Sequence, residues 1–214
     1  MEAKNQAQHI SVVALACSSG GLRAMREILA ALPREFPVPI IIAQHRGDTR
    51  ESYLPEILRT STPLAVRDAQ HGEPLTPGTV HLCPAGRHIQ VTPAGTLSII
   101  DGPRINFVRP SADLLFRSIA EVYGEQGAVV VLTGNGHDGS MGAWAVRKAG
   151  GVVIAQDDAS ADYPDMPRAA IDLGKADLVL PLERIPFALM CLTMGAEAAD
   201  AAMPPAGSKP RLSL

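Results

Sequence analysis

The 214-residue sequence contains only three cysteines, Cys17, Cys83 and Cys191, which lie far apart and form no CxxC pair. Such sparse thiols argue against a disulfide-stapled scaffold and against a zinc site, so we expect reduced cysteines and no bound metal. Aromatic residues are also scarce, at 4% of the chain. Lysine and arginine form no run and the net charge is −3, which argues against a nucleic-acid-binding protein.

Long hydrophobic runs are missing as well. The longest apolar runs, such as residues 39–43 and 128–132, are far shorter than the roughly 20 residues that a membrane-spanning helix needs. The N-terminal residues show no basic flank followed by an apolar stretch, so we expect no signal peptide, no membrane insertion and a cytoplasmic location. With 46% hydrophobic and 19% charged residues, the composition is that of a folded globular protein.

The sequence divides into one long central part and two polar ends. Residues 1–9 are polar, and residues 201–214 include a stretch rich in Pro, Gly and Ser, so we expect both ends to be flexible. The part between them shows no internal repeat and no low-complexity linker. We therefore predict a single domain over residues 10–200.

Four apolar runs are rich in Val and Ile and do not alternate with polar residues, which is typical of strands covered on both faces in a parallel sheet. These predicted strands are residues 10–16, 38–43, 128–133 and 152–156. Helical segments are predicted at residues 22–32, 52–58, 113–123 (with Ser111 as a candidate cap) and 140–149. The alternation predicts an α/β, doubly wound fold with a mainly parallel sheet and helices on both faces.

Between residues 63 and 100 the pattern changes to short apolar pieces separated by turn-forming pairs such as His-Gly, Pro-Gly and Ala-Gly. The pieces are residues 64–66, 80–82, 88–91 and 97–100. We interpret them as β-hairpins, and we expect antiparallel strands among them to extend the sheet.

Polar side chains follow three of the four predicted strands. Ser18 and Ser19 come after the first strand, His45 after the second, and Asp138 lies in the loop after the third. Because the carboxyl ends of parallel strands meet at one edge of a sheet, we expect a hydroxyl, an imidazole and a carboxylate to lie close together there. These groups match the nucleophile, base and orienting group of a triad, although either serine could attack, and each residue could instead cap a helix or fill a strand end.

The loop after the third strand also fits the pattern GxGxxG through Gly134, Gly136 and Gly139, and a predicted helix follows it. The acidic pair at residues 157–158 ends the next strand, about where a ribose-binding carboxylate would lie. A dinucleotide-binding module is therefore an alternative function, but it leaves the serine and the histidine without a role. A catalytically idle domain that binds signalling partners is a second alternative.

Taken together and in order, these motifs resemble the catalytic domain of the CheB-type chemotaxis methylesterases, and the likeness covers about residues 10–190. The matching segments are residues 18–21, 44–45, 101–103, 109–116, 132–139 and 166–168. The resemblance implies that Ser18, rather than Ser19, is the nucleophile, that His45 is the general base and that Asp138 orients the imidazole. It further implies main-chain oxyanion donors at Ser19 and Asn135, and no cofactor.

The resemblance also implies a substrate, namely glutamate γ-methyl esters on the cytoplasmic helices of a methyl-accepting chemoreceptor. Some family members additionally deamidate receptor glutamines. Arg109 and Arg168 are candidates for attracting an acidic receptor surface, or else for structural ion pairs.

The sequence departs from the family pattern at several positions. Family members usually carry a receiver domain, but only about nine residues precede the first predicted strand, so regulation by phosphorylation in cis is not expected of the chain as given. A separate regulatory or receiver protein is a candidate partner. Asn135 stands where the family often has Met, a change that a main-chain donor tolerates. Val108 replaces a family His, and Arg46-Gly47 replaces Met-Pro. Both changes lie near the expected site, so the substrate preference of the family does not carry over on these residues.

Overall fold

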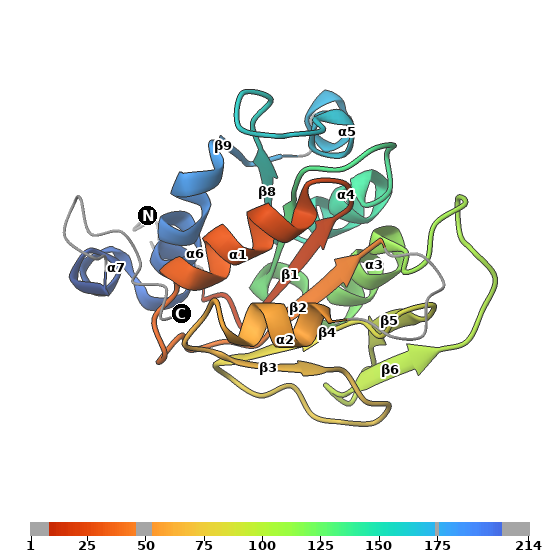
Figure 1. Ribbon diagram of the computed structural model, residues 1–214, viewed down its shortest axis with the longest axis horizontal. Coiled ribbons are helices and arrows are strands. Elements are labelled where there is room, and N and C mark those ends of the chain that lie inside the picture. The colour runs from red at the N-terminus through yellow and green to blue at the C-terminus, as the bar shows by residue number, and fades with distance from the viewer. Residues whose placement is uncertain (1–8, 46–52, 174–175, 203–214) are drawn as a thin grey trace, which may run out of the picture.

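The computed structural model describes residues 9–45, 53–173 and 176–202, and within these ranges a seven-stranded sheet and a separate two-stranded sheet form (Figure 1). The strand order in the large sheet is β3-β4-β2-β1-β7-β8-β9, with every pair parallel. The strands are β1 (Val12–Cys17), β2 (Ile40–Gln44), β3 (Ala65–Asp68), β4 (Thr79–Leu82), β5 (His88–Val91), β6 (Leu97–Ile100), β7 (Gly127–Val131), β8 (Val152–Gln156) and β9 (Leu178–Leu180).

Helices cover both faces of the large sheet. They are α1 (Gly21–Ala31), α2 (Leu54–Arg59), α3 (Ala112–Tyr123), α4 (Ser140–Lys148), α5 (Asp165–Asp172), α6 (Ile185–Met194) and α7 (Ala196–Ala202). Buried residues of α1, α2, α6 and α7 form one hydrophobic cluster, and those of α3, α4 and α5 form the other, together with the β5–β6 hairpin. The predicted doubly wound fold is therefore confirmed. Among the described helices, none is both long and apolar enough to cross a bilayer.

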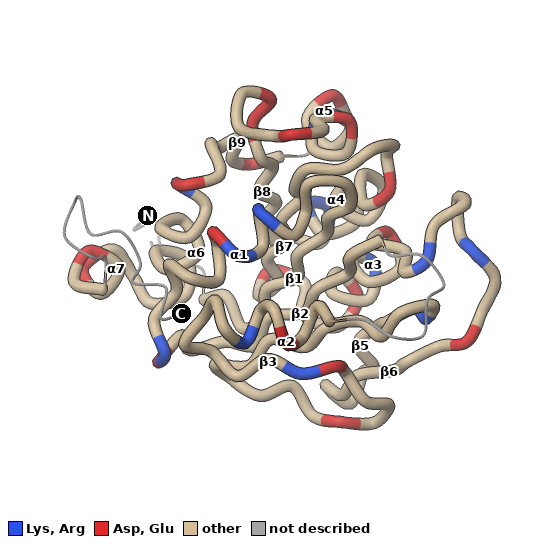
Figure 2. Tube along the Cα trace, viewed as in Figure 1, with Lys and Arg blue, Asp and Glu red and all other residues tan. Residues whose placement is uncertain are grey.

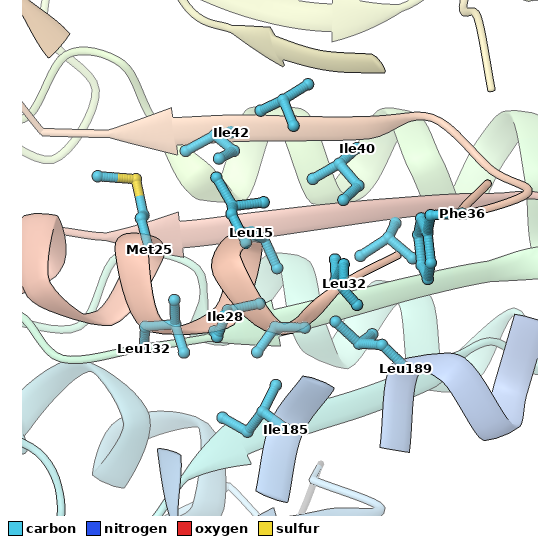
Figure 3. Close-up of a cluster of buried hydrophobic side chains, with 14 of the residues drawn as sticks. Leu15, Met25, Ile28, Leu32, Phe36, Ile40, Ile42, Leu132, Ile185 and Leu189 are labelled. Carbon is cyan, nitrogen blue, oxygen red and sulfur yellow. The ribbon is translucent and has the colours of Figure 1, made fainter. Parts of the chain in front are cut away.

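The continuous apolar character of β1 follows from its central place in the sheet. Val13 and Leu15 point into the cluster under α1, while Val12, Ala14 and Ala16 point into the opposite cluster, and all five are fully buried. Figure 3 shows the first cluster, in which side chains of α1 and α6 pack against those of β1 and β2. Each fully buried Leu or Ile contributes about 1.5–3 kcal/mol by leaving water.

The middle of the chain differs in part from the sequence prediction. β5 and β6 form the predicted antiparallel hairpin, with His88 opposite Ile100, but the hairpin is a sheet of its own. The prediction of hairpins for residues 64–66 and 80–82 is wrong, because β3 pairs parallel with β4, and β4 pairs parallel with β2. The intervening residues 69–78 carry the chain from the carboxyl end of β3 back to the edge of the sheet where the strands begin. Their His-Gly and Pro-Gly turns therefore belong to a crossover loop and not to a hairpin.

The parallel register brings the ends of the central strands together. Cys17 lies opposite Gln44 in the β1–β2 pair, and Ala16 lies opposite Val131 in the β1–β7 pair. The residues that follow β1, β2 and β7 therefore emerge side by side at the carboxyl edge of the sheet.

Candidate active site

Ser18 lies in a tight turn between β1 and α1. Its N–H donates to Thr133 O at 3.0 Å, and its carbonyl accepts from Gly21 N at 3.0 Å. Gly20, the N-cap of α1, has φ +77°, a left-handed conformation that glycine adopts without strain. The turn thus leads from strand to helix within a few residues and leaves Ser18 partly exposed at the start of α1.

The backbone at Gly134 passes directly against Ser18. A Cβ atom at Gly134 would lie 2.8 Å from Ser18 Cβ and 3.0 Å from Ser18 N, and it would overlap Met166 Sδ. Only glycine allows the loop after β7 to approach the serine this closely.

His45 follows β2 and is held by both its backbone and its ring. Its N–H donates to Cys17 O at 3.0 Å, which keeps it beside the residue that precedes Ser18. Its Nε2 lies 2.7 Å from Asp138 Oδ2, and the two side chains are only 10% and 3% exposed. The structure therefore brings His45 and Asp138 into direct contact, next to the turn that carries Ser18.

Asp138 is surrounded by donors from the start of α3. Oδ1 accepts from Ser111 Oγ at 3.0 Å and from Asp113 N at 3.2 Å, while Oδ2 accepts from Ala112 N at 2.6 Å in addition to His45. Burial alone would raise the pKa of Asp138, but the hydrogen bond from His45 and those from the helix N–H groups lower the pKa below its usual value. The partial positive charge of the helix N-terminus acts in the same direction. Asp138 is therefore an ionised carboxylate.

A second buried carboxylate, Asp113, lies in the first turn of α3 and accepts hydrogen bonds from the start of α4. Its Oδ1 accepts from Gly139 N at 3.0 Å and from Gly142 N at 2.7 Å, so it caps the start of α4 while Asp138 caps the start of α3. Burial and the charge of Asp138 raise the pKa of Asp113, opposed by the N–H of Gly142. The reciprocal caps fix the loop that carries Asp138.

The two predicted oxyanion donors also lie beside the turn. Thr133 Oγ1 donates to Ser19 O at 3.0 Å, and Asn135 Nδ2 donates to Ser19 Oγ at 2.9 Å, which joins the two loops. Within the described ranges, neither the N–H of Ser19 nor that of Asn135 takes part in a hydrogen bond. Both main-chain donors are thus available to a ligand next to Ser18.

The two arginines that the sequence suggested for substrate contact have internal partners. Arg109 Nη1 donates to Gly102 O at 2.7 Å and closes the base of the loop between β6 and α3. Arg168, on α5, is exposed and pairs with Asp158 at 2.6 Å. A role for either arginine in binding substrate stays a prediction.

The glycine-rich loop after β7 does not favour the dinucleotide alternative. In a nucleotide-binding protein the N-terminus of the following helix holds the pyrophosphate, but here the carboxylate of Asp113 fills that position. The N–H of Gly134 is likewise engaged, with Tyr163 O at 2.8 Å. The acidic residues proposed for ribose bind elsewhere, Asp157 to Ser160 Oγ at 2.7 Å and Asp158 to Arg168.

Sequence reasoning overlooked the residues that hold the candidate triad in place. Ser111 was predicted only as a helix cap, which it is, since Leu114 N donates to its Oγ at 3.4 Å, but it also donates to Asp138. Asp113 was not predicted at all. The sequence signal that could have indicated it was a carboxylate in the first turn of a predicted helix, among apolar residues.

A serine beside a histidine–aspartate pair, at the carboxyl edge of a doubly wound parallel sheet, is the constellation of a serine hydrolase. The model of the CheB methylesterase family matches residues 13–189, and the chain belongs to this family, as the motifs predicted.

Similar proteins agree with this assignment. The chain is 43% identical over 179 residues to the protein-glutamate methylesterase FrzG of Myxococcus xanthus. This alignment covers 84% of this chain and 54% of FrzG. It is 42% identical over 188 residues to protein-glutamate methylesterase/protein-glutamine glutaminase 2 of Anaeromyxobacter dehalogenans, covering 88% of this chain and 55% of that protein. The chain thus spans about half the length of these curated relatives.

A solved structure shares the fold. The catalytic domain of the Thermotoga maritima CheB methylesterase superposes with a TM-score of 0.82 at 35% sequence identity, covering 86% of this chain and 99% of that chain. The architecture described above is therefore that of a CheB catalytic domain.

Proposed function

We propose that this protein is a serine hydrolase that removes methyl groups from glutamate γ-methyl esters of chemoreceptors. The observation that carries the proposal is the 2.7 Å contact between His45 Nε2 and Asp138 Oδ2, next to the partly exposed turn at Ser18. The names of the relatives, protein-glutamate methylesterases, support the same substrate class.

The protonation of Asp138 decides which atom of His45 acts as the base. An ionised carboxylate only accepts hydrogen bonds, so Nε2 carries the hydrogen and Nδ1 of the neutral ring has the free lone pair. In the proposed reaction, Nδ1 takes the proton of Ser18 Oγ as Oγ attacks the ester carbonyl. The imidazolium then gives this proton to the departing methoxide, and methanol leaves an acyl-enzyme.

Hydrolysis of the acyl-enzyme repeats these steps with water. Nδ1 of His45 removes a proton from water, the hydroxide attacks the acyl carbon, and Ser18 Oγ recovers the proton as it departs. The product is a glutamate carboxylate. In both steps the N–H groups of Ser19 and Asn135 would hold the developing oxyanion, and losing one such donor typically costs about 10²–10³-fold in rate.

The partners follow from the substrate. We place the reaction in the cytoplasm, on the cytoplasmic helices of a methyl-accepting receptor, with a separate receiver protein as a candidate regulator. A glutamine carboxamide would pass through the same acyl-enzyme with ammonia as the leaving group. Because relatives are also named protein-glutamine glutaminases, an ammonia readout belongs in the same assay.

Methanol release from methylated receptor tests the proposal, with Ser18→Ala and Ser19→Ala compared with the wild type. Ser18→Ala should lower the rate by about 10⁴-fold or more and abolish labelling by an organofluorophosphonate. Ser19→Ala is the matched control, because the Ser19 side chain only accepts from Asn135. It should retain labelling. Labelling that survives in Ser18→Ala would overturn the assignment of the nucleophile, and an unreactive wild type would favour a catalytically idle binding domain.

A further inference from the structure

Several of the few aromatic side chains are exposed near the candidate site. The chain has four Phe, three Tyr and one Trp. Three of them lie on the segments that lead into α2, α3 and α5, namely Tyr53, Phe107 and Tyr163, which are 73%, 93% and 45% exposed. Trp144, 39% exposed, lies instead in a surface groove between α3 and α4. Apolar aromatic surface is therefore concentrated on loops at the carboxyl edge of the sheet.

Phe107 differs from the other exposed aromatic residues because its backbone is strained and its side chain is almost fully exposed. It shares the tip of a tight turn with Asn106, and their φ angles are +67° and +50°. Two hydrogen bonds close the turn, from Ile105 N to Val108 O at 3.1 Å and from Val108 N to Ile105 O at 3.0 Å. A bulky residue rarely adopts a left-handed backbone, and such outliers concentrate at functional sites.

The loop that presents Phe107 is anchored to the candidate catalytic residues. The ring of His88 joins the two ends of the loop, because its Nε2 donates to Pro103 O at 2.9 Å and its Nδ1 accepts from Ser111 N at 3.1 Å. Ser111 in turn donates to Asp138. Phe107 lies four positions before Ser111, so their Cα atoms are at most about 14 Å apart. Figure 1 shows the loop between β6 and α3 extending past the carboxyl ends of β1 and β2.

We propose that Phe107 is a substrate-recognition residue that packs against an apolar side chain on the α-helical protein segment carrying the glutamyl ester. The inference rests on the proposed function and names the partner's surface chemistry. The apolar side chain and the ester lie on the same helical segment, because Phe107 is close in the chain to Ser111, which contacts Asp138. Aromatic residues, Phe among them, are enriched at protein interfaces, and a few such anchors carry most of the binding energy.

The charges on the loop suit the same partner. Arg104, which is exposed, adds positive charge next to the turn, and Figure 2 shows basic residues along this loop together with acidic charge close to β6. The acidic residue there, Asp101, is paired with Arg87. A helix that carries several glutamates, esterified or free, is acidic and matches this charge. A helical segment with acidic residues and an apolar position near the ester is therefore the occupant that the loop fits.

Phe107→Ala tests the inference, with Trp144→Ala as the matched control of an exposed aromatic away from the carboxyl edge. The measurements are KM and kcat for methanol release from methylated receptor, and the rate of organofluorophosphonate labelling of Ser18. Phe107→Ala should raise KM about 5- to 30-fold with little change in kcat or in labelling, because the small probe does not reach the loop tip. Trp144→Ala should match the wild type in all three.

A second variant separates recognition from folding. Phe107→Gly relieves the positive φ, so its thermal midpoint should be higher than that of Phe107→Ala, while its KM should be raised as much. Phe107→Leu should restore part of the affinity. Equal KM values for Phe107→Ala, Trp144→Ala and the wild type would overturn the inference while leaving methanol release, and hence the proposed function, intact. Loss of self-association in place of a change in KM would also overturn it.

Discussion

Replacing Asp138 by Asn probes the hydrogen-bond network at the site while barely changing its shape. The carboxylate accepts four hydrogen bonds, two at Oδ2 from His45 and Ala112 and two at Oδ1 from Ser111 and Asp113. An amide offers only one oxygen, so its NH₂ group must face a backbone N–H in either orientation. If the NH₂ group takes the Oδ2 position, it donates to His45 Nε2 and forces the ring into the tautomer with hydrogen on Nδ1. In that tautomer Nδ1 cannot accept a proton from Ser18.

The expected magnitude follows from these contacts. In the other orientation the ring keeps its tautomer but loses the ionised partner that stabilises the imidazolium. Asp138→Asn should therefore lower kcat for methanol release by about 10³–10⁴-fold. One buried N–H left facing an amide N–H should also lower the free energy of unfolding by about 1–3 kcal/mol.

The control and the assay separate these effects from general damage. Asp158→Asn makes the same chemical change at an exposed carboxylate that pairs with Arg168, so its activity and its stability should match the wild type closely. Methanol release would be followed on receptor-containing membranes, and the unfolding free energy would be measured in urea. A rate for Asp138→Asn within tenfold of the wild type would refute the reasoning that Asp138 sets the tautomer and the charge of the base.

Three further predictions test neighbouring features. Gly134→Ala should reduce fluorophosphonate labelling by at least about 10²-fold, because the added Cβ displaces Ser18; labelling at the wild-type rate would show that the loop can yield. Asp113→Ala should lower the free energy of unfolding in urea by about 1–3 kcal/mol, because two buried N–H groups lose their acceptor. Asp113→Asn should lose less stability, because its amide oxygen can still accept both hydrogen bonds. Equal losses in the two variants would contradict the capping role. The pKa of Asp138 is lowered in the folded state, so its contribution to stability is complete above the unfolded value of about 3.9 and is lost as pH falls through the folded pKa. Urea unfolding followed from neutral pH to well below about pH 3.9 should therefore show a larger loss of stability in the wild type than in Asp138→Asn.

The strands of the sheet centre could be predicted from the sequence because burial on both faces leaves a direct mark. A residue such as Leu15 or Ile154 must be apolar whichever face it points to, so β1, β2, β7 and β8 appear as unbroken apolar runs. The pairing of β3 with β4 could not be predicted, since turn-forming dipeptides report local conformation and not the direction in which the chain returns. α6 is apolar around most of its circumference, so it shows no amphipathic stripe that would mark it as a helix.

The candidate site divides in the same way. Ser18, His45 and Asp138 follow strand ends, and the parallel sheet alone is enough to gather such residues at one edge. Ser111 and Asp113 contact Asp138 and the start of α4 only because α3 and α4 cross closely, where a Cβ at Gly142 would lie 2.6 Å from Phe116 Cβ. Such a crossing depends on packing between segments more than 20 residues apart in the chain, which local patterns do not encode.

The parallel register between β1 and β2 also limits how this domain can change during evolution. Removing a single residue from β2 would draw His45 back by about 3.3 Å and turn its ring to the opposite side of the sheet. Insertions in the crossover loops leave the strand ends where they are, so length variation among descendants of this chain should collect in those loops and spare the strands.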